Sequence, residues 1–529
     1  MTSSAGDREV PLDELLALKD FDARPVPQAV QIIGVLVDLA GDARSEAGLN
    51  QAFAWGEALA SRSLDEVQKA QLSYFRANLW AHRRHARHAD RAIAWQWEQP
   101  ELQEEMLELR RAVGSEGFGS FDPLLQCAVL TNLGGLLNTV GRFVEALEYW
   151  RRALEINSKF GMAWGNRGVG LRTYAVAAYD PWHQHMLING AYASFNRAFA
   201  DEIIYNVGDG PSIEYFLSER KGIEERVEVG LLHEPPPPTT SEPGRSKIER
   251  AHRRWCLDEG LFLNPINDLG GDGTAALDDL LLPSFVAPIT EPPSLMGFFN
   301  QIKQEYVAAR WAAYEGIRQK RFHFADRDVE LYNTLDYSSY SMAVERTRQA
   351  FRSAYSIFDK IAVFINEYMK LGLPSKSVYF RGIWYKNGDA RQRILSDEFT
   401  KIENLPMRGL YWLAKDLYQE GFRDVTEPEA HALHEIRNQL EHGYLKVHEI
   451  LIPQPAELNS MDAMWRDAMA YSIQRENFEV KTLRVLKLVR ASLIYLCFAM
   501  HREEAVRRKD DGRFLAPMEL DILDDKRKY

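Results

Sequence analysis

The sequence has few cysteines and no long apolar run, and both absences narrow the class of protein. Its three cysteines, Cys127, Cys256 and Cys497, form neither a C-x-x-C pair nor a spaced framework. An odd, scattered set excludes a disulfide scaffold and is typical of a reducing cytoplasm. The longest apolar stretch, 491–500, is about half the roughly 20 residues that a membrane helix needs. The polar, acidic start lacks a secretory signal. We therefore expect a soluble cytoplasmic protein without membrane contact.

A positive net charge is also missing, because the formal net charge is −12. This excludes a protein-wide field that attracts nucleic acid, so any RNA contact must come from a local patch. In 529 residues there are 12 Trp and 22 Tyr, too many for a mostly disordered chain, and the length predicts two or three domains.

Residues 130–158 carry the spacing of a two-helix repeat and resemble a tetratricopeptide repeat. The matching positions are Leu130, Leu133, Gly134, Leu137, Ala146, Trp150 and Ala153. A second unit begins in phase at Trp164, Gly168 and Leu171, and "YAVAAYDPWHQHML" reads as an insertion before a helix near 191–200. Upstream, 68–100 reads as another helical pair. An irregular helical bundle is the alternative, and either form indicates a scaffold or binding surface.

Two other features of the chain favour ordinary structure over a ligand site. His82, His85 and His88 are spaced by three, but such steps drift around a helix and no carboxylate brackets them, so a solvated basic face is favoured over a metal site. The glycine cluster at 270–273 lacks the Lys-Ser/Thr of a phosphate loop and predicts a turn.

The second half predicts a helical bundle. Amphipathic patterns cover about 341–371, 405–421 and 478–506, and a capping box at Thr426-x-x-Glu429 with Pro428 starts a further helix through about 449. Four helices with one apolar stripe each bury those stripes against one another. An extra helix over about 296–319 is expected to dock on the side.

These patterns together predict an all-α protein in five parts. The expected parts are an N-terminal arm (1–29), a tetratricopeptide-like repeat array (30–232), a Pro/Gly-rich linker and connecting segment (233–295), a bundle domain (296–510) and a charged tail (511–529).

The segment "HEIRNQLEH" contains the candidate chemistry. It nearly matches the zinc motif H-E-x-x-H, but Asn438 stands where the second histidine should be, so a metal site is disfavoured. Helical geometry puts Leu433, Ile436, Leu440, Tyr444 and Val447 on the core face. His442 and Asn438 then point outward, Arg437 lies on the flank, and Leu445 is also expected outward.

Arg437, Asn438 and His442 match the R-x-x-x-x-H signature of the HEPN family, which this half of the chain resembles over about 255–505. The resemblance implies a four-helix bundle that cuts single-stranded RNA without metal or other cofactor through attack by the 2′-hydroxyl. His442 is then the acid/base, Arg437 the phosphate clamp, and Asn438 orients the imidazole or the phosphate. It also implies a homodimer with a composite site, and the combination with repeats is similar to a bacterial subfamily linked to phage defence and toxin systems.

One local patch is the candidate RNA contact. The segment 376–393 combines cations and aromatic side chains, which suit phosphate contact and base stacking. The candidate residues are Lys376, Arg381, Trp384, Tyr385, Lys386, Arg391 and Arg393. A loop whose aromatic side chains pack on the bundle is the alternative.

The preferred function is a metal-independent endoribonuclease whose repeat domain senses a signal or restrains the nuclease. A protein, peptide or antitoxin partner is expected to bind the repeats. The alternative is a non-catalytic scaffold that binds protein, RNA or nucleotide.

Overall fold

The computed structural model describes most of the chain. The described residues are 11–87, 91–205, 209–233, 244–270, 273–286, 291–319, 321–334, 336–419, 421–422, 427–449, 469–510, 518 and 520–528. His88 and the cap residue Thr426, which carry two of the sequence predictions, lie outside them. The described chain is mostly helical, which confirms the predicted fold class apart from one small sheet.

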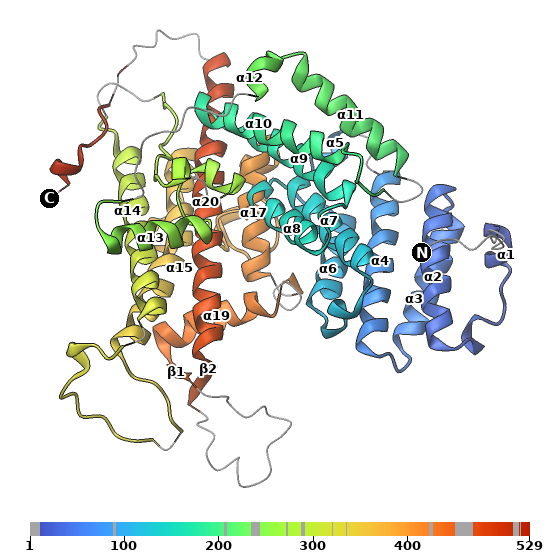
Figure 1. The fold of residues 1–529 in the computed structure, drawn as a ribbon, viewed down its shortest axis with the longest axis horizontal. Helices are drawn as coiled ribbons and strands as arrows, with labels where there is room; N and C mark the ends of the chain where they lie inside the picture. The colour runs from blue at the N-terminus through green and yellow to red at the C-terminus, as the bar shows by residue number, and fades with distance from the viewer. Residues whose placement is uncertain are drawn as a thin grey trace.

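The N-terminal half is a succession of helices that pack on their neighbours along the chain (Figure 1). They are α1 (Leu12–Leu16), α2 (Val26–Asp42), α3 (Glu46–Ala60), α4 (Glu66–Arg87), α5 (Arg91–Ala94), α6 (Pro100–Gly114), α7 (Pro123–Thr139), α8 (Phe143–Ile156), α9 (Gly161–Ala177), α10 (Pro181–Ala198), α11 (Gly210–Glu224) and α12 (Val229–His233). Asp122 and Asp180 accept hydrogen bonds from the backbone of the first turns of α7 and α10, each just before a proline, so sequence chemistry sets these starts.

The hairpin α7–α8 occupies the segment with the clearest repeat spacing. Gly134 lies so close to the buried Trp150 indole that a Cβ there would be 2.6 Å from Nε1. This explains why a glycine on α7 faces a tryptophan on α8. The insertion predicted at 174–187 is wrong: these residues form the end of α9 and the start of α10, the two helices of the next hairpin. The predicted pair at 68–100 is also wrong, because α4 is one long helix whose partner is α6. The tetratricopeptide character of the array stays a prediction.

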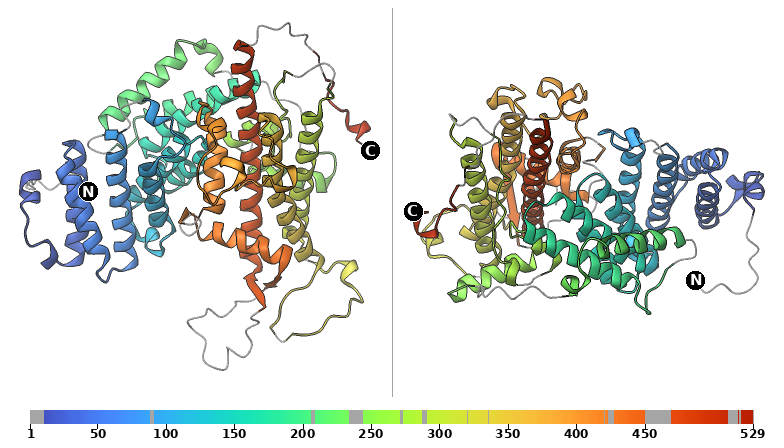
Figure 2. Two further views of the ribbon diagram at one scale, coloured as in Figure 1. Left: turned by 180° about the vertical axis from the view of Figure 1, so that it is seen from behind. Right: turned by 90° about the horizontal axis from the view of Figure 1, so that it is seen from above.

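The C-terminal half surrounds one long central helix, α20 (Arg475–Asp510) (Figure 2). Around it lie α15 (Met342–Met369), α17 (Leu405–Tyr418) and α19 (Glu427–His442), which pack on α20 and on one another as predicted for a bundle. The extra helix α14 (Ser294–Arg318) packs along α15, and α16 (Asp397–Thr400) is one turn.

A small parallel sheet corrects the predicted end of α19. The helix ends at His442, and β1 (Tyr444–His448) pairs with β2 (Ala470–Gln474), directly before α20. Leu445, expected on the outward face of a longer helix, is instead buried in β1. The chain beyond Gly443 is a strand and does not follow the helical period, so the projected helix face placed Leu445 wrongly, although Val447 is buried as expected.

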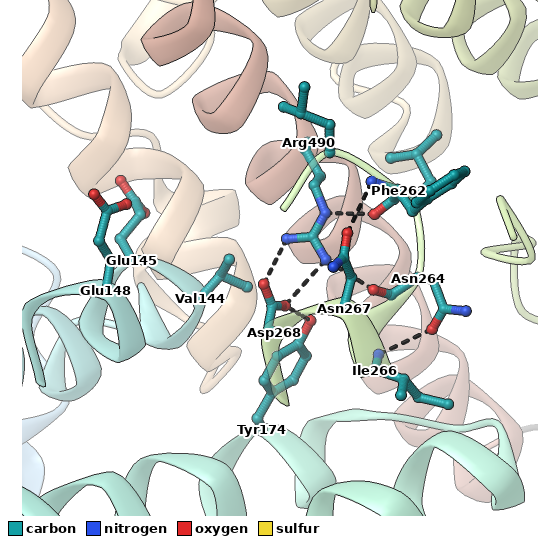
Figure 3. A network of polar contacts seen from close by, with 12 residues as sticks. Val144, Glu145, Glu148, Tyr174, Phe262, Asn264, Ile266, Asn267, Asp268 and Arg490 are labelled. Atoms are coloured by element: carbon teal, nitrogen blue, oxygen red, sulfur yellow. Dashed lines mark hydrogen bonds and ion pairs between the residues drawn. The ribbon is translucent and has the colours of Figure 1, made fainter. Parts of the chain in front are cut away.

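The segment expected to connect two domains contributes to the core. It contains α13 (Lys247–Asp258), and the chain that follows buries Leu261, Leu263 and Ile266. Figure 3 shows how Arg490 of α20 reaches this segment. Its guanidinium donates to Asp268 at 2.7 Å and to the Asn264 carbonyl at 2.8 Å, and Asp268 also accepts from Tyr174 of α9 at 2.9 Å.

A second buried polar contact joins the two halves directly. Asp416 of α17 accepts from both Nη atoms of Arg110 in α6, each at 2.7 Å, and is also paired with Arg142 at the start of α8. All three side chains are at least 95% buried. Burial raises the pKa of the Asp416 carboxyl, but the two guanidinium groups outweigh it and hold the pKa below its usual range. The apolar core is continuous across this junction, from Ala70 to Met500.

Candidate active site

The helix α19 is fixed against the bundle by the apolar face that the sequence predicted. Leu433, Ile436 and Leu440 are buried, and β1 continues this packing with Val447. Two arginines of α15 hold the end of the helix: Arg352 donates to the Leu440 carbonyl at 2.6 Å, and Arg348 donates to the Leu445 carbonyl at 2.7 Å. The first bond satisfies a carbonyl group in the last turn of α19, where positive charge is stabilising, and the second holds β1 directly after the helix.

His442 lies exposed at this well-anchored end. The Gln439 side chain accepts from the Tyr444 backbone at 3.0 Å, which closes the turn from α19 into β1 just after His442. Within the described residues, the His442 ring has neither a hydrogen bond nor an ion pair. Its imidazole is therefore accessible to a ligand while its backbone is held in place.

Arg437 lies on a different side of the same helix. One of its Nη atoms donates to the Asn438 amide oxygen at 3.3 Å, and the other lies 4.0 Å from Glu441, so the guanidinium is only loosely paired. The side chain is 31% exposed. Five residues correspond to about 140° around a helix. Arg437 therefore lies toward α15 and α17, where its charge acts on Asp359 and Tyr418, whereas His442 is exposed on another side. The structure thus joins Arg437 with Asn438 but makes no contact between Arg437 and His442.

Sequence reasoning missed Asp359, which faces Arg437 from α15. Its carboxylate accepts from the Phe380 backbone at 2.9 Å. Burial raises the pKa of Asp359, and the nearby guanidinium groups of Arg437 and Arg381 partly offset that rise. The signal that could have revealed Asp359 in the sequence is its acidic side chain between the core residues Phe358 and Ile361. Asp359 links α19 to the cationic segment 376–393.

The candidate RNA segment divides into two groups of residues. Lys376, Arg381, Lys386, Arg391 and Arg393 are exposed. Trp384 is 0% exposed, with its indole donating to the Phe380 carbonyl at 2.8 Å, and Tyr385 is 9% exposed. The predicted stacking role of Trp384 is therefore wrong, and Tyr385 is covered nearly as fully. These rings anchor the loop on the bundle, as the alternative interpretation proposed, because burial of apolar rings stabilises the fold.

A cavity of about 660 Å³ opens beside this loop, between it and α17. Arg381, Arg391 and Arg393 line one side, and Lys415, Tyr411 and Tyr418 of α17 line the other. Lys376 and Lys386 are not lining residues, and the Lys386 ammonium lies 3.5 Å from Asp397. Of the cationic candidates, the tertiary structure thus gathers only the arginines around one space.

Metal ligation has no support within the described residues, where no three His, Cys, Asp or Glu side chains gather as a metal site would require. The side chains of His434 and His88 lie outside what is described. Nor do the described helices include any that is both long and apolar enough to cross a membrane.

The C-terminal half is thus a helical bundle in which one helix, α19, carries an Arg-Asn pair and an accessible histidine. Residues 286–503 match the family model "LA2681-like HEPN". The chain thus contains a C-terminal LA2681-like HEPN domain, preceded by an N-terminal helical region. Searches of curated proteins and of solved structures found no match.

Proposed function

We propose that the protein is a metal-independent endoribonuclease whose active site is built on Arg437, Asn438 and His442. The observation that carries the proposal is an accessible, unpaired His442 on the same anchored helix as a loosely paired Arg437, within an HEPN domain. HEPN domains are often associated with ribonuclease activity.

The proposed reaction is transfer of the phosphoryl group within the RNA strand. The ribose 2′-oxygen bonds to phosphorus as its proton moves to a base, and the P–O5′ bond breaks as an acid protonates the leaving oxygen. An imidazole can serve in either role because it exchanges protons near neutral pH. The Arg437 guanidinium holds the non-bridging oxygens, whose negative charge increases in the transition state. The products are a 2′,3′-cyclic phosphate and a 5′-hydroxyl.

We further propose that two subunits pair so that both copies of His442 reach one phosphate. One histidine per chain cannot be base and acid at once in a single step, and the outward position of His442 leaves it open to a second subunit. The predicted contribution of Leu445 to such an interface does not enter the proposal, because Leu445 is buried. Light scattering at micromolar concentration tests the pairing, and a monomer that cleaves RNA at full rate contradicts it.

The N-terminal helices are proposed to sense a protein or peptide partner and to restrain the nuclease. The buried contacts of Asp416 with Arg110 and Arg142 support this, because they join α6 and α8 to α17, which packs on α19. A defence or toxin setting agrees with such restraint. The competing function is a scaffold without catalysis.

Incubation of purified protein with total RNA, with and without EDTA, tests the activity. We expect chelator-resistant cleavage with cyclic-phosphate ends, and loss of cleavage in Arg437→Ala and His442→Ala. Arg226→Ala is the matched control, since Arg226 is exposed and unpaired among the described residues but remote from α19 in sequence. If wild type and all variants leave RNA intact, the scaffold function replaces the nuclease.

A further inference from the structure

The cavity between the 386–394 loop and α17 is lined by an excess of positive charge. Arg381, Arg391, Arg393 and Lys415 line it, against one described acidic lining residue, Asp389. The two Asp389 oxygens are already engaged, one by the Arg391 backbone at 3.0 Å and the other by the Gln392 amide at 3.2 Å. Asp389 therefore orders the loop, and its single negative charge leaves most of the positive charge of the three arginines uncompensated.

The three arginine side chains lack ionic partners. Within the described residues, no carboxylate lies within ion-pair distance of Arg381, Arg391 or Arg393. By contrast, the Lys415 ammonium is buried, donates to the Gln103 side chain of α6 at 2.9 Å and lies 3.7 Å from the Glu98 carboxylate. Three exposed guanidinium groups around one concave space form a site for an anion with several oxygens, because each can donate two parallel hydrogen bonds.

The loop that carries these arginines is held in one shape. The Lys386 backbone donates to the Ile394 carbonyl at 2.9 Å, the Ser396 backbone donates to the Trp384 carbonyl at 2.9 Å, and the Trp384 ring is buried beneath. Arg393 has a φ of 51°, in the left-handed region that non-glycine residues seldom occupy. A loop ordered before binding loses less conformational entropy when a ligand arrives.

An aromatic ring completes the cavity. Tyr379 lines it and is 44% exposed, and the Arg381 guanidinium lies 5.7 Å from the centre of its ring. An exposed tyrosine next to guanidinium groups offers a stacking face for a planar base beside contacts for a phosphate. The volume of about 660 Å³ lies within the range of small-ligand sites.

We propose that this cavity binds a nucleoside phosphate, with the phosphate on Arg391 and Arg393 and the base against Tyr379. One nucleotide of an RNA strand is favoured as the source, because α17, which lines the cavity, packs on α19, the helix that carries Arg437. That choice of source rests on the proposed nuclease function, whereas the pocket itself does not. A free nucleotide is the other source of the same chemistry.

Binding is measured in the His442→Ala background, so that cleavage cannot consume the probe. A labelled short oligoribonucleotide is titrated by fluorescence anisotropy, and nucleoside monophosphates are titrated by calorimetry. Arg391→Ala/Arg393→Ala is compared with Arg226→Ala/Lys401→Ala, which removes the same charge from two exposed residues outside the cavity lining. Tyr379→Ala is the second variant, and it keeps the charge unchanged should the arginine pair fail to fold.

We expect the double variant Arg391→Ala/Arg393→Ala (the cavity pair) to weaken oligonucleotide binding by about tenfold or more for each guanidinium removed. The double variant Arg226→Ala/Lys401→Ala (the control pair) should weaken it by less than about threefold. Monophosphate binding that depends on Arg391 and Arg393, with oligonucleotide binding unaffected, supports the pocket and assigns a free nucleotide to it. Equal loss in the cavity and control pairs, or no loss for either ligand, overturns the proposal. Binding that behaves as expected in a protein that never cleaves RNA refutes the nuclease and leaves the pocket standing.

Discussion

The arginines of this protein occupy two contrasting regions. At the junction of the two halves, Arg110, Arg142 and Arg490 are almost fully buried and paired with aspartate or glutamate. Around the candidate site, Arg391 and Arg393 are exposed and have no described partner, and Arg437 has only a loose one.

This difference separates charge that holds the fold from charge that is available to a ligand. A buried guanidinium must be paired, because an unpaired charge in the interior is strongly destabilising. An exposed one can remain unpaired at little cost. α17 belongs to the first kind: Asp416 is paired with Arg110, and its neighbour Lys415 is buried beside Glu98, although Lys415 also lines the cavity. The comparison predicts that variants in one region change stability and variants in the other change binding or catalysis.

The largest expected effect is catalytic. His442→Ala should lower the rate of RNA cleavage by about 100-fold or more, because proton transfer by a positioned imidazole contributes that much. The melting temperature should stay close to that of wild type, since His442 is exposed and unpaired. Single-turnover cleavage and a thermal melt check the two parts. A large drop in melting temperature would place His442 with the structural residues.

Breaking the junction should mainly change stability. Asp416→Asn removes the buried anion that Arg110 and Arg142 share, although Arg142 keeps Glu145, and should lower the free energy of unfolding by about 3–5 kcal/mol. Denaturant titration measures the change. Glu148→Gln is a matched control, because Glu148 lies on α8 with its nearest cation 3.9 Å away and 37% of its side chain exposed. Similar losses in both variants would contradict a special role for the buried pair.

The junction should also weaken in acid. The pKa of Asp416 is depressed in the folded state, so its contribution is complete above the ordinary aspartate pKa. It is lost as the pH falls through the lower, folded-state value. We therefore expect the stability gap between wild type and Asp416→Asn to be constant near neutral pH and to shrink in acid. Denaturant titrations at several pH values measure this gap, and a gap that widens in acid has the wrong sign.

The smallest expected effect is the stability change from removing the unpaired arginines. Arg391→Ala and Arg393→Ala should each change the free energy of unfolding by no more than about 0.5 kcal/mol, because neither side chain has an ionic partner. Thermal melts compared with Lys401→Ala check this. A loss of several kcal/mol would mean that the loop arginines support the fold and would blur the distinction between the two regions.

Periodicity predicted much of the fold. Stripes at helical spacing located α15, α17 and α20 to within a few residues, because burial of an apolar stripe imposes that spacing. It failed where a strand follows a helix: α19 ends at His442 just before Gly443, and 444–448 pairs with 470–474, a partner that only the fold supplies. The predicted domain limits remain predictions. The apolar core continues from the N-terminal half into the C-terminal half, across these limits.

The candidate site was partly visible in the sequence. The signature residues and the cationic segment could be selected from their types and spacing alone. Trp384 could not be assigned from sequence, because an aromatic residue in a basic loop suits both stacking on a base and burial in the core. Asp359 was hidden because it comes from another helix, far from Arg437 in the chain.

The sequence by itself determined the acidic net charge, and it predicted most of the helices, since helix formation depends on neighbours within a few turns. Only the tertiary structure decided which charges are paired and which are free. Asp416 meets Arg110 across 306 residues of chain, and the loop arginines meet α17 around one cavity. Whether a charge is neutralised depends on what packs against it, and that is a property of the folded chain.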